Sequence, residues 1–168
     1  MDSSHPMNRR RILGVFASAA GAAASGALPI AARAHHGWSS FDPDTPIYLK
    51  GRVKSVRWRN PHVEFDLETA PDLALPGDIA ARRIPAQASN FDGKAILAKT
   101  RLPEQQHAVW EIELAPLTRM RAWDVSPIEE GDTVELIGYT LADRSEPVLR
   151  AEWLFRDGKV YGLRSSPA

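Results

Sequence analysis

Hydrophobic and polar residues alternate in short runs from residue 47 onward, a pattern typical of β-strands that bury one face. The first run, IYLKGRVKSVRW, places Leu49 and Val53 on one face of a strand and Val56 and Trp58 on the other. Such a change of phase inside one strand predicts a bulge, here near Lys54–Ser55. The sequence therefore predicts that the folded part begins with a long, bent strand.

Five shorter strands and one short helix are predicted after it. The strands are expected at HVEFDLE (residues 62–68), AVWEIELA (108–115), TVELIGYT (133–140), VLRAEWLF (148–155) and KVYGL (159–163). The helix is expected over Pro116–Trp123, because proline is favoured in the first turn of a helix. Arg156–Gly158 (RDG) indicates a hairpin turn between the last two strands.

The order of these elements favours an all-β fold. A helix between the third and fourth strands of a five-stranded barrel is the arrangement of the OB-fold, a partly open barrel that binds ligands over one face and through its loops. We therefore expect a small OB-like barrel of five to six strands over residues 47–168, with one short helix between strands 3 and 4. A β-sandwich can be built from the same number of strands and stays open as an alternative.

Two segments do not follow the strand pattern. Residues 69–107 are rich in Ala, Pro and Arg and have no sustained period, so we interpret them as an insertion with a short helix or hairpin near Phe91–Lys94. A loop of this length is uncommon and is usually either functional or mobile. Residues 35–46 (HHGWSSFDPDTP) predict an extended lead-in, since their prolines and aspartates oppose a regular helix. Trp38 and Phe41 are expected to anchor this lead-in.

Residues 1–34 have the three parts of an export signal. A basic start precedes the Ala- and Gly-rich stretch Ile12–Ala32, and Ala32–Arg33–Ala34 fits the small-residue cleavage pattern. Arg9–Arg10 resembles a twin-arginine address. We expect cleavage between Ala34 and His35 and a periplasmic or secreted mature protein. An uncleaved membrane anchor is the alternative, although Ala and Gly give the stretch little tendency to insert.

Removal of this segment changes the charge of the chain. The sequence has 21 basic and 21 acidic residues, and the segment holds four arginines and one aspartate, which leaves 17 basic and 20 acidic residues. The resulting net charge of −3 argues against a nucleic-acid partner, which favours a basic surface. The sequence has no cysteine, which excludes disulfides and thiolate metal sites. Met120 is the only methionine left, which excludes a thioether-rich copper(I) site.

Histidines supply the candidate chemistry. Cleavage would make His35 the first residue, and its free α-amine and imidazole Nδ1 can together chelate one metal ion. A second histidine from elsewhere completes such a histidine brace. His62 is the candidate, because Asn60–Pro61 fixes it at the entrance of a strand, on the polar face of that strand. A set of nitrogen ligands favours copper(II), and the adjacent His36 is a third candidate ligand.

Other interpretations of the same residues stay open. Two histidines near a terminus can form a solvated tail, and His62 can simply cap its turn. We expect His107 at the surface. The acidic residues that alternate along 64–68 are typical of a solvated strand face, because they lack the loop geometry that calcium prefers. The sequence contains no G-x-S-x-G elbow and no H-E-x-x-H motif, so it does not indicate an enzyme.

The residues around His62 also resemble a known family. An Ala-His-His start after a signal, followed by LKGRVKSVRWRNPHVEFDLE, is similar to domain of unknown function 6152, a group of short exported bacterial proteins. The family pattern is L-x-G-x-V-x-x-V-x-W-x-N-P-H, a W-x-(I/V)-E strand and a P-G-D-like turn before the next strand. The matching positions are Leu49, Gly51, Val53, Val56, Trp58, Asn60, Pro61 and His62, then Trp110, Ile112, Glu113, Gly131 and Asp132.

This resemblance extends over most of the mature chain and departs from the family in two places. The 69–107 insertion replaces a short turn, and LTRMRAW (117–123) replaces a Leu-Leu-Arg-like run. The resemblance implies export and the strand order, and it implies no activity. It also makes His35, His36 and His62 recurrent parts of a pattern.

These observations predict an exported small binding or accessory protein. The leading hypothesis is a copper(II) site formed by His35 and His62, with His36 nearby. The competing hypothesis is an accessory module that binds a ligand or an envelope partner protein without a metal. A copper-dependent oxidase is a third, for which the sequence indicates no substrate surface. No stable membrane insertion is expected after cleavage.

Overall fold

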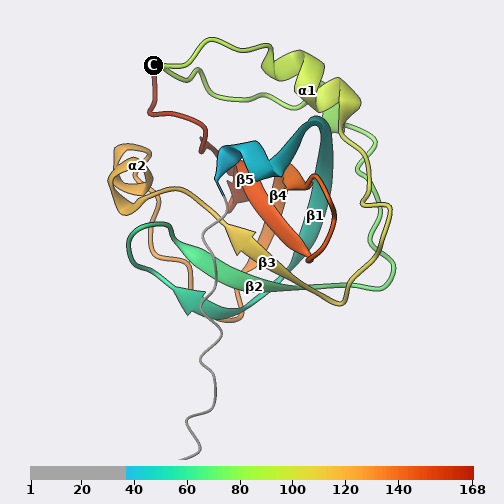
Figure 1. Cartoon of the computed structure of the whole chain (residues 1–168). Coiled ribbons are helices and arrows are strands. Elements are labelled where there is room, and N and C mark those ends of the chain that lie inside the picture. The colour runs from blue at the N-terminus through green and yellow to red at the C-terminus, as the bar shows by residue number, and fades with distance from the viewer. Residues whose placement is uncertain (1–36) are drawn as a thin grey trace, which may run out of the picture. The chain divides into compact units, whose positions relative to one another are not determined.

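The computed structural model describes residues 37–168, so the predicted export signal and the pair His35–His36 lie outside the described residues. The elements in chain order are η1 (Trp38–Ser40), β1 (Phe41–Arg57), β2 (Glu64–Thr69), η2 (Ile79–Ala81), α1 (Gly93–Lys99), β3 (Val109–Glu113), α2 (Leu117–Ala122), β4 (Thr133–Leu141), β5 (Val148–Arg156) and β6 (Lys159–Gly162). Figure 1 shows the strands at the centre, with α1 and α2 beside them. The prediction of an all-β fold is confirmed. Over residues 37–168, no helix combines the length and apolar character needed to cross a bilayer.

The strand pairings return on themselves. The sheet has the order β3-β2-β1-β4-β5-β6, and β3 pairs in addition with β5. This additional pairing is parallel and joins Glu111–Glu113 to Val148–Arg150, whereas the other pairings are antiparallel. Each of β1 to β5 therefore has a partner strand on both sides. The predicted helix between the third and fourth strands is α2.

The first strand is bent as expected. The register between β1 and β2 shifts between Val53 and Val56, which confirms the bulge. The strand also begins earlier than Ile47, because Phe41 already pairs with Leu141 on β4. Regular pairing resumes only at Pro46, so the intervening residues of the lead-in lie outside the ladder. Pro43 and the aspartates Asp42 and Asp44 are tolerated there because these positions form no hydrogen bond in the ladder.

The main core lies between the strands. It contains apolar residues from all of β1 to β5, among them Leu49, Val53, Phe65, Leu67, Trp110, Ile112, Leu136 and Leu149. Met120 of α2 is fully buried against the same core. Because each strand directs alternate side chains to one face, the pattern from which the strands were predicted is also the pattern that fills this core.

The 69–107 insertion packs on the outer face of the sheet. Ile79 of η2 and Leu97 of α1 form a second apolar cluster with Tyr48, Ile137 and Trp153, which lie on β1, β4 and β5. Burial on both faces explains why β4 and β5 are almost continuously buried, whereas β2 still alternates. The helix expected near Phe91–Lys94 is α1, which begins after Asp92.

The C-terminal segment is bound to the insertion. Gln87 and Pro167 form an isolated antiparallel bridge, and the amide of Ala88 donates to the carbonyl of Ser166 at 2.9 Å. Figure 1 shows the C-terminus beside this part of the insertion. The insertion is thus attached both by the second apolar cluster and by the end of the chain.

The close approach of β1 to β2 at Gly51 can be tested by substitution of this glycine. A Cβ added at Gly51 would lie 2.2 Å from the backbone oxygen of Glu68, so the two strands would have to separate. We expect Gly51→Ala to lower the free energy of unfolding by ~1–3 kcal/mol, the range for overpacked sites. Gly77→Ala is the control, because nothing lies within 4 Å of its added Cβ. Equal urea midpoints for the two variants would contradict the close approach.

Truncation of a buried leucine tests whether the insertion belongs to the fold. Leu97 is 1% exposed, whereas Leu75, in the same insertion, is 36% exposed. We expect Leu97→Ala to cost ~2–5 kcal/mol because it leaves a cavity in the second apolar cluster. Leu75→Ala should change the unfolding free energy by less than ~0.5 kcal/mol. Equally small losses in urea unfolding would show that the insertion contributes little to stability.

Candidate functional site

His62 lies at the corner between β1 and β2. The Asn60–Pro61 peptide bond before it is cis. The amide of Val63 donates to the carbonyl of Ala115, and the amide of Leu114 donates to the carbonyl of Val63, so the β2–β3 ladder continues past Glu64 by one residue. His62 therefore stands at the very end of this ladder and has the same phase as Glu64. Its side chain is half-buried and its Nδ1 atom is shielded from solvent.

The outer face of β2 and β3 carries carboxylates in opposed pairs. Glu64 stands opposite Glu113 in the ladder, and Asp66 stands opposite Glu111. Like charges directly opposite each other on neighbouring strands are destabilising, so this arrangement requires cations close by.

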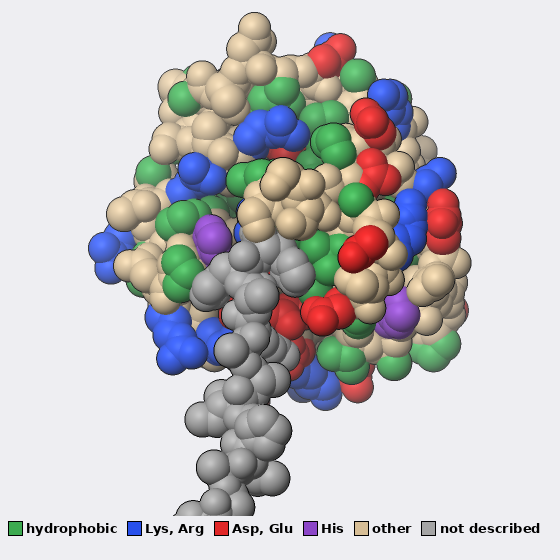
Figure 2. Space-filling model, viewed as in Figure 1, with side chains coloured by type: hydrophobic (Ala, Val, Ile, Leu, Met, Phe, Trp, Pro, Cys, Tyr) green, Lys and Arg blue, Asp and Glu red, His purple; other side chains and the backbone are tan. Residues whose placement is uncertain are grey.

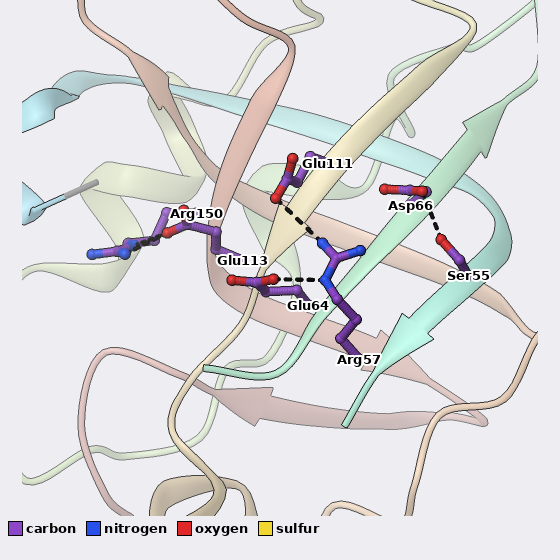
Figure 3. Close-up of polar contacts among 7 residues, drawn as sticks. All are labelled: Ser55, Arg57, Glu64, Asp66, Glu111, Glu113 and Arg150. Atoms are coloured by element: carbon purple, nitrogen blue, oxygen red, sulfur yellow. Dashed lines mark hydrogen bonds and ion pairs between the residues drawn. The ribbon is translucent and has the colours of Figure 1, made fainter. Parts of the chain in front are cut away.

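Arg57 at the end of β1 provides one such cation. Its Nε donates to Glu64 at 2.8 Å and its Nη2 to Glu111 at 3.3 Å, so a single guanidinium bridges one member of each carboxylate pair (Figure 3). The hydroxyl of Ser55 donates to Asp66 at 2.7 Å in the same row. Figure 2 shows acidic and basic side chains interspersed on the side of the molecule that it presents.

Arg150 on β5 provides the second cation. Its Nε donates to Glu113 at 3.0 Å, its Nη2 contacts the same carboxylate oxygen, and both side chains are about 95% buried, with 5% and 4% exposed. The guanidinium lies 5.0 Å from the ring centroid of Trp38 and 4.8 Å from that of Phe41. Trp38 and Phe41 thus pack on an arginine whose carboxylate partner, Glu113, lies on the outer face of β3 (Figure 3).

His107 lies at the other end of β2. The hydroxyl of Thr69 donates to its carbonyl oxygen at 2.7 Å, and its ring meets Trp110 edge-on at 5.2 Å. The side chain is half-buried rather than fully exposed, and it lines a pocket of about 220 Å³ together with Leu73 and Pro103. The described residues contain no group of three or more His, Asp or Glu arranged to hold a metal ion.

Two further polar clusters hold the insertion and the C-terminus in place. Arg82 of the insertion donates to Glu135 at 2.7 Å, and Lys50 contacts the same carboxylate at 3.1 Å. Partial burial would raise the pKa of Glu135, but the hydrogen bonds from Arg82, Lys50 and Tyr48 outweigh it and lower this pKa. Burial also raises the pKa of Tyr48.

The second cluster surrounds Glu152, which is fully buried on β5. Burial raises the pKa of Glu152, an effect that the hydrogen bonds of Arg164 at 2.9 and 3.1 Å oppose. Burial likewise raises the pKa of Tyr139, to about 12. Because Arg164 comes from the C-terminal segment, we interpret this cluster as an attachment of the chain end. The candidate site is therefore the β2–β3 face.

Among the predicted ligands, the structure describes His62, whereas His35 and His36 lie outside the described residues. The prediction missed the two arginines that balance the acidic row, Arg57 and Arg150. A signal for Arg150 was present, because VLRAEWLF has charged residues inside an otherwise apolar strand, and buried charges need partners.

Comparison with known proteins supports the resemblance seen in the sequence. A family model described as "Family of unknown function (DUF6152)" matches residues 23–74. Over these residues, the chain resembles DUF6152. The match includes His35, His36 and His62 and ends early in the insertion, so it covers a shorter part of the chain than the motifs suggested. No curated protein and no solved structure matches the chain.

The lowered pKa of Glu135 predicts a pH dependence. An unfolded glutamate titrates near ~4.3. Since the folded value lies below this, the stability that Glu135 contributes is present above pH ~4.3 and is lost as the pH falls through the folded pKa. Wild-type protein should therefore lose more unfolding free energy below pH ~4.3 than Glu135→Gln. Glu130→Gln, at an exposed glutamate, controls for net charge. Parallel pH profiles of wild type and Glu135→Gln would contradict the ion-pair cluster.

Proposed function

We propose that this protein is an exported, small binding protein that holds copper(II) in a histidine brace. The ligands would be the α-amine and imidazole of His35, exposed by cleavage after Ala34, and the imidazole of His62. His36 would lie nearby. The role would be to bind or deliver the metal in the cell envelope, after export through the twin-arginine route.

We also propose that the described domain is an OB-like barrel. The support for this fold is the circuit of pairings β1–β2–β3–β5–β4–β1, in which the β3–β5 pairing is parallel, and the position of α2 between β3 and β4. In such barrels one sheet face and the loops at its edges bind ligands. The polar β2–β3 face and the His62 corner correspond to that region.

The observation that carries the copper proposal is the position of Trp38. Its ring lies against Arg150, which pairs with Glu113, and Glu113 stands opposite Glu64 in the β2–β3 ladder. Glu64 shares its phase with His62 two residues earlier. The segment that follows the proposed N-terminal ligands therefore reaches the sheet face to which His62 belongs, as a shared metal ion would require.

The chemistry of the donors agrees with this proposal. An amine and two imidazoles form the all-nitrogen set that favours copper(II) in a near-planar geometry. The family match covers the proposed cleavage position and all three histidines. The carboxylate of Glu64, which Arg57 holds, belongs to the same strand face as His62 and would be the acceptor that orients its imidazole, as acceptors around metal-bound histidines do.

The pocket beside His107 favours a second candidate function. Its volume of about 220 Å³ and its lining by Leu73, Pro103 and Trp110 suit a small ligand with an apolar part. In this alternative the protein is an accessory module for a ligand or a partner, and its histidines are polar contacts without a metal. A copper oxidase that uses the same brace would be recognised by peroxide formation that depends on a reductant.

Copper(II) titration of the exported protein tests the proposal. Intact mass should first show that the chain begins at His35. His62→Ala, and a variant with one extra residue before His35, should each weaken binding by roughly 100-fold or more, since loss of an outer-shell partner alone costs ~10–100-fold. Affinity should also fall as the α-amine, with a pKa near ~7.7–8, becomes protonated.

His107→Ala is the matched control, because it removes an imidazole at the opposite end of β2 and should leave the copper affinity unchanged. Wild-type affinity in both ligand variants would exclude the brace and favour the accessory module.

A further inference from the structure

We propose that Arg150 is the positioning residue of the copper site, which rests on the function proposed above. It would set where the mature chain begins on the β2–β3 face, and so bring the N-terminal ligands within reach of His62. The proposal concerns the place of the chain start; Arg150 itself would not bind the metal.

The geometry around Arg150 suits this role. Glu113 holds the guanidinium from β3, and the rings of Trp38 and Phe41 lie 5.0 and 4.8 Å from it. The two rings also meet each other edge-on at 6.5 Å. A planar guanidinium offers flat faces to aromatic rings and its edge to a carboxylate, so one side chain can hold both the sheet and the lead-in.

Chain length makes the position of Trp38 decisive for the ligands. Two residues lie between His35 and Trp38, so the two positions are three residue steps apart, and three fully extended steps span only roughly 10–11 Å. A displacement of Trp38 by several ångströms would therefore move His35 by a large fraction of the distance that it can lie from Trp38. Trp38 is the first described aromatic residue after His35 and His36, so its contact with Arg150 is the nearest anchor to these proposed ligands.

Burial of Trp38 does not explain the contact by itself. Its side chain remains 48% exposed, so about half of its surface stays in contact with water. A buried ion pair such as Arg150–Glu113 is also a weak source of stability compared with well-packed apolar residues. What the arrangement provides is a defined place and orientation for the lead-in.

A second ion pair on the same strand supplies a matched comparison. Glu152 follows Arg150 by two residues on β5 and pairs with Arg164, whose guanidinium lies 4.7 Å from the ring of Phe91. Here an aromatic ring of the insertion lies on an arginine of the C-terminal segment. The arrangement of carboxylate, arginine and aromatic ring is the same, but here it holds the C-terminal segment instead of the lead-in.

The test compares Trp38→Leu with Phe91→Leu in protein purified after export, with copper(II) as the probe. Trp38→Leu should weaken copper(II) binding by roughly 10-fold or more and alter the copper EPR spectrum, since His35 would lose the anchor that holds it within reach of His62. Its urea midpoint should stay near that of the wild type, because the side chain is half exposed. Phe91→Leu should leave both the affinity and the spectrum unchanged.

Arg150→Met combined with Glu113→Gln extends the test without leaving a buried charge unpaired. It should reproduce the affinity loss and spectral change of Trp38→Leu. If Trp38→Leu and, where it folds, this double variant bind copper(II) with wild-type affinity and spectrum, the positioning role is overturned while the copper site stands. If the wild type itself binds no copper(II), both proposals are overturned.

Discussion

The short parallel pairing of β3 with β5 is the contact on which the rest of the structure depends. It joins β3, at one end of the antiparallel order, to β5, so that the pairings of β1 to β5 form a circuit, and these strands supply most of the main core. The same ladder sets Glu113 opposite Arg150, and both are almost fully buried. A slip of one residue would turn Glu113 toward the apolar core and leave Arg150 without this carboxylate, so the ion pair also fixes the register.

Closure of the sheet divides its outer surface into two unlike regions. The insertion covers β4 and β5 with apolar residues such as Ile79 and Leu97, whereas β2 and β3 keep a polar outer face. Along β5 the covering changes from residue to residue: the lead-in lies on Arg150, the C-terminal segment on Glu152 and the insertion on Trp153. The only part of this surface built from opposed carboxylates is therefore the part next to His62 among the described residues.

The sequence could predict elements that local periodicity encodes. Val63, Phe65 and Leu67 alternate because every second side chain enters the core, and α2 begins at Leu117, directly after Pro116, where its start was expected. The β3–β5 pairing has no such local signal, because it depends on segments far apart in the chain. The packing of the insertion was missed for a related reason: its apolar residues meet a sheet face at irregular spacing and form no regular strand or helix pattern. The partners of Arg57 and Arg150 depend on register, which the sequence does not encode locally.

The use of a charged pair, Arg150–Glu113, beneath the first described residues has a physical meaning. Apolar residues of similar size could fill the space of Arg150 and Glu113 without the loss of hydration that two charges suffer on burial. Such residues would be indifferent to how Trp38 lay on them, because dispersion forces have little direction. A guanidinium held at its edge by Glu113 leaves only its faces to the rings of Trp38 and Phe41. A fold that gives up stability to orient Trp38 has a use for the position of this residue, and the proposed metal-binding amine of His35 would be such a use.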